Sequence, residues 1–128
     1  MKPDYFASAA EVKRLLKPQS VSSTATGTGI ATANYQGGML ITMDADKASA
    51  GTTPTLIVTI QTATENSFSS PTTLKTFTTV TDAAGDGVQT AQIMADQSLG
   101  FIRAVGTIAG TNSPTFAFSV TAAALKHY

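Results

Sequence analysis

The sequence has 128 residues and a formal net charge of zero, which suits a single domain. Charged residues make up only 12%, about half the usual share of roughly 25%. The absence of cysteine excludes a disulfide scaffold and a thiolate metal site, and a single histidine with no tryptophan argues against a zinc enzyme. Balanced charge also argues against an electrostatic nucleic-acid binder.

The first predicted element is a short amphipathic helix or extended arm over residues 4–17. Asp4 suits a helix N-cap, and Pro18 ends the pattern because the residue before a proline is disfavoured in a helix. Apolar side chains recur at helical spacing at Tyr5, Ala9, Val12 and Leu16. We therefore expect an N-terminal helical arm, residues 1–18, followed by a single β-sandwich domain, residues 19–128.

From Gln19 onward the sequence consists of strand and turn patterns. A weak edge strand is expected near Thr28–Thr32. Apolar residues that alternate with polar ones predict six further strands, over residues 38–44, 56–61, 73–80, 88–94, 101–108 and 115–123. Leu74 and Phe77 break the two-residue period, which predicts a β-bulge between them.

Glycine and proline clusters separate these strands, and no helical crossover fits between them. The expected fold class is therefore all-β, an antiparallel β-sandwich that is jelly-roll-like, preceded by the short N-terminal helix or arm.

Candidate catalytic and metal-binding patterns are weak. Asp44 and Asp46 have the Asp-x-Asp spacing of metal-dependent sugar transferases, but two polar residues at a strand end explain them as well. The segment Asp82–Gly87 lacks the alternating ligands of a calcium loop. His127 has no acidic neighbour in the sequence to form a nucleophile–base pair. We expect no enzyme and no catalytic, cofactor-binding or metal-binding residues.

Arg103 alternates with apolar residues in a predicted strand, and two interpretations of it stay open. Its stem packs on the strand while its head reaches water, or it contacts another protein. The basic N-terminal arm is expected to dock onto protein rather than onto a membrane or nucleic acid. The longest apolar stretches are a few residues, far below the ~20 of a membrane helix, and no secretory signal is recognised, which predicts synthesis in the cytoplasm.

The low charge leaves little repulsion between copies, and sheet edges with few charged residues tend to pair. Such a chain is better suited to a fixed assembly than to free solution. This favours a structural or adhesive module.

Four segments resemble small β-sandwich proteins of tailed-bacteriophage virions, including capsid cement or decoration proteins. They are residues 35–41 (YQGGMLI), 55–61 (TLIVTIQ), 101–111 (FIRAVGTIAGT) and 116–120 (FAFSV). The resemblance implies a structural virion protein, made in the host cytoplasm, that sits in many copies on the outer capsid surface and bridges capsomers. It implies the major capsid protein as partner, a homo-oligomer (dimer or trimer), and no catalytic residues.

Under this hypothesis the residues expected to contact partners are Tyr5, Phe6, Val12, Arg14, Leu15, Leu16 and Arg103. Two alternatives remain. One is a carbohydrate-binding module associated with a phage fibre or host attachment, although the sequence has few aromatic platforms for sugar. The other is a small β-sandwich enzyme or metal-binding domain, which would need loop carboxylates that converge in the fold.

Overall fold

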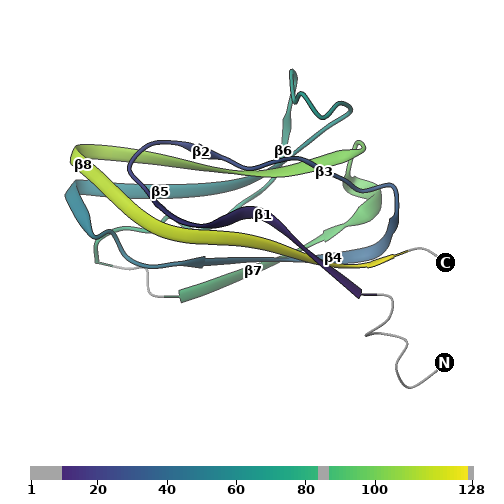
Figure 1. Cartoon of the computed structure of the whole chain (residues 1–128), viewed down its shortest axis with the longest axis horizontal. Helices are drawn as coiled ribbons and strands as arrows, with labels where there is room; N and C mark the ends of the chain where they lie inside the picture. Colours follow the sequence, from purple (N-terminus) through teal and green to yellow (C-terminus); the bar gives the residue numbers. More distant parts are fainter. Residues whose placement is uncertain (1–9, 84–86, 127–128) are drawn as a thin grey trace.

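Antiparallel strands account for nearly all regular structure in the computed structural model, which describes residues 10–83 and 87–126 (Figure 1). The elements are β1 (Ala10–Val21), β2 (Ala25–Thr26), β3 (Ile30–Ala31), β4 (Tyr35–Ala45), β5 (Ala50–Ala63), β6 (Thr72–Thr76), β7 (Gly87–Met94), a 3₁₀ turn η1 (Ala95–Gln97) and β8 (Phe101–Lys126). The predicted all-β antiparallel sandwich is confirmed.

The long strand β8 joins two sheets. Its second half pairs with β1 and β4, and β7 lies beyond β4; we call these four strands sheet A. Its first half pairs with β2, β3 and β5, and β6 lies beyond β5; we call these sheet B. Between the halves Gly110, Asn112 and Ser113 have positive φ of 125°, 60° and 54°, and the chain turns back at the left edge of Figure 1.

The core lies between the sheets, on the faces that the sequence pattern predicts. Leu56, Val58 and Ile60 of β5 are at most 1% exposed. Met39, Ile41 and Met43 of β4 and Phe116, Phe118 and Val120 of β8 oppose them in the same buried cluster. Because strand side chains alternate between faces, the intervening residues point outward.

The helix expected over residues 4–17 is wrong over its described part, since residues 10–17 belong to strand β1. β1 runs through Pro18 to Val21, and its register with β8 shifts between Leu16 and Gln19. The physical reason is that an isolated helix of this length is marginal, whereas β1 pairs with β8 from Ala10 to Val21. Residues 4–9 of the expected helix lie outside the described residues.

Two predicted irregularities appear in sheet B. Opposite β5, Thr73 pairs with Gln61 and Lys75 with Ile60, so Leu74 is the extra residue of the expected bulge. Within the weak edge strand expected near Thr28–Thr32, the structure has the two-residue strand β3, and a second two-residue strand, β2, precedes it.

Candidate functional site

The outer face of sheet A carries few charged residues. Directly paired residues on neighbouring strands project from the same face, and the register defines three rows across the sheet. They are Val12, Ala123, Leu40 and Gln92; Arg14, Thr121, Thr42 and Thr90; and Ser119, Asp44 and Val88.

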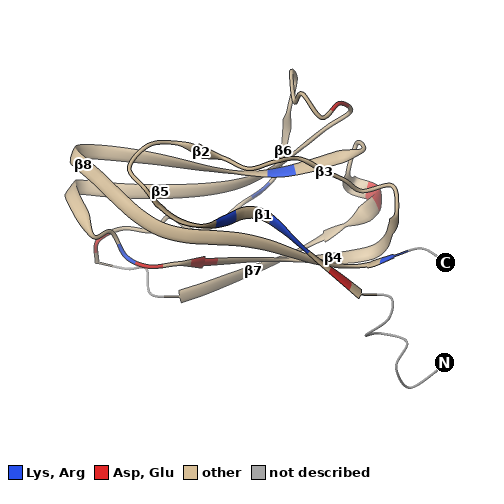
Figure 2. Cartoon of the chain, in the orientation of Figure 1, with Lys and Arg blue, Asp and Glu red and all other residues tan. Residues whose placement is uncertain are grey.

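Apolar side chains on this face are well exposed: Val12 by 68%, Val88 by 60% and Leu40 by 50%. Among the eleven residues of these rows two are charged, Arg14 and Asp44, a share somewhat below the roughly 25–35% of an ordinary soluble surface. Figure 2 shows how little of the described strands is charged. A face of this kind suits an extended contact with another protein surface. The alternation in residues 38–44 puts Leu40, Thr42 and Asp44 on one side of the strand, and this is the sequence signal for the face.

The structure places the predicted partner-binding residues in different settings. Val12 and Arg14 lie together on the outer face of sheet A. Leu15 and Leu16 are only 1% and 4% exposed and pack in the protein's own core. Tyr5 and Phe6 lie outside the described residues.

Both leucines are buried because the register of β1 shifts twice, between Arg14 and Leu16 and between Leu16 and Gln19. The backbone of β1 here approaches that of Gly27, where an added Cβ would lie 1.7 Å from the Leu15 carbonyl oxygen. Only glycine fits so close an approach. Beside it lies a hollow of about 390 Å³, whose lining includes Arg14, Lys17 and Thr28.

Glu11 ties the beginning of β1 to two neighbouring elements. The Tyr35 hydroxyl donates a 2.6 Å hydrogen bond to Glu11 Oε1, Lys13 Nζ lies 3.0 Å from the same oxygen, and Lys126 Nζ lies 3.3 Å from Oε2. These partners, the Tyr35 hydrogen bond first, lower the pKa of Glu11 to about 2. Burial, followed by the bond to Glu11, raises the pKa of Tyr35 to about 12. Sequence patterns do not reveal this cluster, because Tyr35 and Lys126 are distant from Glu11 in the chain.

Arg103 lies on sheet B, where it makes contacts within the chain. Its Nε donates to Gln61 Oε1 at 2.9 Å, and its guanidinium stands 4.4 Å from the centre of the Phe68 ring. The ring itself lies close to Gly29, because a Cβ at Gly29 would be 2.5 Å from it. Arg103 therefore holds the loop after β5 against sheet B, and its contact with a partner stays a prediction.

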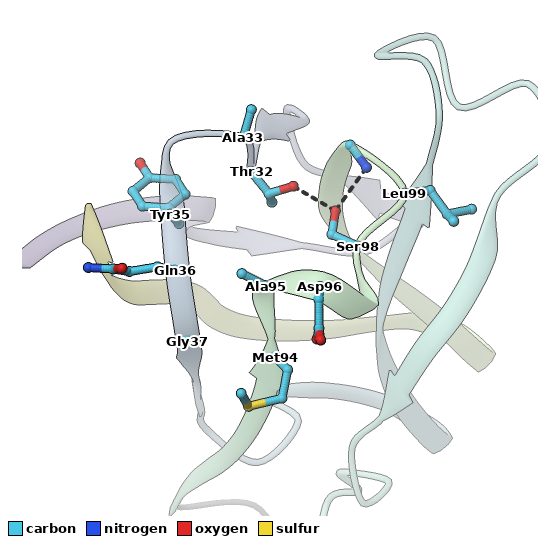
Figure 3. Close-up of a pocket in the computed structure, with 11 residues that line it drawn as sticks. Thr32, Ala33, Tyr35, Gln36, Gly37, Met94, Ala95, Asp96, Ser98 and Leu99 are labelled. Atoms are coloured by element: carbon cyan, nitrogen blue, oxygen red, sulfur yellow. Dashed lines mark hydrogen bonds between the residues drawn. The ribbon is translucent and has the colours of Figure 1, made fainter. Parts of the chain in front are cut away.

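A hollow of about 500 Å³ lies beside η1 (Figure 3). Thr32 Oγ1 donates to Ser98 Oγ at 2.7 Å, and Ser98 Oγ accepts from the Gly100 amide at 3.1 Å. Behind them Thr62 accepts from the Leu99 amide and donates to the Phe101 carbonyl, both at 2.8 Å. These hydroxyl groups bond one another and the backbone, which fixes the turn around η1.

Asp44 and Asp46 do not join a larger group of carboxylates among the described residues. Asp44 and Asp46 line a hollow of about 200 Å³ next to Pro18. Within residues 10–83 and 87–126, no three His, Cys, Asp or Glu side chains are grouped to hold a metal ion. Part of the segment Asp82–Gly87 lies outside the described residues, as does His127.

Across the described part of the chain, no helix has the length and apolar character needed to cross a membrane. Neither a protein-family profile nor a curated protein sequence matches the chain.

Two solved structures share aspects of the fold. A chain from Bacillus endospore appendages, a family of disulfide-linked pili, is 14% identical with a TM-score of 0.49, over 94% of this chain and 90% of that one. A chain of the infectious bursal disease virus Gx strain is 13% identical with a TM-score of 0.43, over 92% of this chain but only 32% of that one. At these scores neither likeness carries an inference about function.

Proposed function

We propose that the chain is a structural virion protein of a tailed bacteriophage, which binds the outer capsid surface and stabilises the shell by bridging capsomers. Its partner is the major capsid protein, and the proposal includes no catalysis. After synthesis in the host cytoplasm, the protein resides on the outer surface of the capsid.

The outer face of sheet A is the observation that carries this proposal. Val12 and Leu40 are exposed on this face. The neighbouring row contains three threonines, and the charged residues of the three rows are Arg14 and Asp44. A lattice presents the same complementary surface many times, so weak contacts at each copy suffice once a protein touches two neighbouring subunits. The resemblance of the strand segments to cement proteins supports the same function.

Binding to capsids that lack the protein tests the proposal. Purified capsids from phage without the coding sequence are mixed with the protein, sedimented, and assayed for bound copies and for resistance to heat. Leu40→Glu places a charge on the outer face of sheet A and should abolish binding. Ile57→Glu is the matched control, because Ile57 is 37% exposed on the opposite sheet. The proposal is contradicted if the unaltered protein does not sediment with capsids. It is also contradicted if Leu40→Glu and Ile57→Glu reduce capsid binding equally.

The segment before β1 is a second expected contact. Tyr5 and Phe6 are the aromatic residues of this segment. Deletion of residues 1–9 leaves β1 whole and should weaken capsid binding if this segment lies along the shell. Binding of equal strength by the shortened protein removes the segment from the proposal.

A carbohydrate-binding module associated with a phage fibre or host attachment is the second candidate. The hollow beside η1 favours it, because Gln36 and Asp96 line that hollow with groups that hydrogen-bond sugar hydroxyls. However, Tyr35, the aromatic residue in the lining, is only 7% exposed and offers little stacking surface. Binding to a glycan array that Asp96→Asn abolishes would favour this candidate over the first.

A further inference from the structure

The edge strand β7 differs from the other edges of the two sheets. Sheets normally protect an exposed edge with charges, prolines, bulges or short strands, because unpaired backbone groups bind other chains. β1 contains Pro18, Lys13 and Lys17 and shifts register twice. On sheet B, β6 is five residues long with Lys75 and a bulge, and β2 and β3 have two residues each.

None of these protections is present in β7. Its eight residues, Gly87–Met94, contain neither a charge nor a proline. Its register with β4 is unbroken from Gly38 opposite Met94 to Ala45 opposite Gly87. β7 ends the strand order of sheet A, and Figure 2 shows it without charge along its whole length at the lower margin of the molecule.

The backbone groups of β7 that do not pair with another described strand can be assigned to particular residues. The Met94 amide donates to the Gln97 side chain at 2.8 Å, so it points away from β4. In an antiparallel strand every second residue directs its amide and carbonyl to the same side. Val88, Thr90 and Gln92 therefore direct theirs outward as well. On the outer face, Val88 is 60% and Met94 is 42% exposed beside this edge.

We propose that two copies of the chain associate through β7, in antiparallel pairing about a two-fold axis near Thr90 and Ala91. A two-fold axis places each position of the strand opposite itself or a near neighbour in the second copy. A strand that carried a charge would then meet the same charge, and β7 carries none. The paired dimer continues sheet A from one copy into the next.

This dimer extends the proposed function, because it joins two low-charge outer faces into one surface of twice the width. It does not depend on that function. Self-association is measured on the purified protein without capsids, so its failure is distinguishable from a failure to bind capsids.

Sedimentation velocity over a concentration series up to about 100 µM tests the association. We expect the unaltered protein to dimerise. Thr90→Lys and Thr90→Glu each place like charges together across the axis and should raise the Kd roughly tenfold or more. A monomeric unaltered protein would overturn the proposal.

Thr42→Lys is the matched control. Thr42 lies directly opposite Thr90, one strand further in and on the same outer face. The Thr42→Lys substitution adds the same charge to the outer face but leaves the edge strand β7 unchanged, so the dimer should persist. If Thr42→Lys disrupts the dimer as strongly as Thr90→Lys, the copies meet face to face and the edge pairing is wrong.

Mixing the two Thr90 variants provides the rescue. Lysine and glutamate then meet across the axis. Native mass spectrometry of the mixture should show a heterodimer at a concentration where each variant alone is mainly monomeric. The melting temperature of each variant in dilute solution verifies that it is folded. Absence of the heterodimer from folded variants contradicts pairing through β7.

Discussion

Replacement of Leu15 by alanine distinguishes a core strand from a peripheral arm. Leu15 is 1% exposed inside the sandwich, and truncation of a leucine in such a site costs about 2–5 kcal/mol, a large part of a total stability of roughly 5–15 kcal/mol. Val12 lies three residues earlier on the same strand and is 68% exposed, so Val12→Ala should change the stability by no more than ~0.5 kcal/mol.

Urea denaturation followed by circular dichroism in dilute solution measures both effects. We expect a lower midpoint for Leu15→Ala at an unchanged slope, because the surface exposed on unfolding stays nearly the same. Equal effects of the two substitutions, or a larger effect of Val12→Ala, would refute the placement of β1 in the sandwich. The placement also limits truncation experiments: removal of residues 1–18 would delete Leu15 and Leu16 and unfold the protein, whatever the arm contacts.

Three other predictions concern single contacts. Gly27→Ala should lower the melting temperature, at a cost of about 1–3 kcal/mol, because the new Cβ would lie 1.7 Å from the Leu15 carbonyl oxygen; an unchanged melting temperature would mean that β1 passes further away. Thr62→Val leaves the Leu99 amide without its acceptor and should lower the free energy of unfolding by about 1–3 kcal/mol, measured by urea denaturation. Thr55→Val on the same strand should lower it much less. Similar losses of stability in both variants would count against the hydroxyl network. The pKa of Glu11 is lowered from 4.5 to about 2 in the folded protein, so the stability that Glu11 contributes is complete above pH 4.5 and is lost as the pH falls toward 2. Over this range the melting temperature should fall less steeply for Glu11→Gln than for the unaltered protein. Parallel plots of melting temperature against pH for the two proteins would contradict the ion-pair cluster.

The strand pattern was predictable where one face of a strand is buried and the other is not. Leu56, Val58 and Ile60 face the core as their two-residue spacing predicts, and Leu74 forms the expected bulge. A shift of one residue would expose the whole apolar set, so the sequence specifies such strands strongly. Two of the predicted strands, residues 101–108 and 115–123, are the two halves of β8, which reverses direction between them at Gly110, Asn112 and Ser113.

Residues 10–17 were not predictable in the same way. Apolar residues at helical spacing favour a helix locally, and the competing partner, the C-terminal half of β8, is about a hundred residues away in the sequence. Two register shifts then bury adjacent leucines, which neither the helical nor the strand period predicts. The Glu11 cluster was missed for a related reason, since Tyr35 and Lys126 come from other strands.

The distribution of charge along the edges explains how so neutral a chain limits its association. β1 contains Lys13, Arg14 and Lys17, and a proline removes one of its backbone donors. Charge is thus concentrated at one edge of sheet A and absent from the opposite edge, β7. If both edges were unprotected, copies would add at either end and form open fibres, whereas one protected edge stops growth after a single pairing. The proposed pairing through β7 would then stop at two copies and keep their outer faces available for a second, different surface.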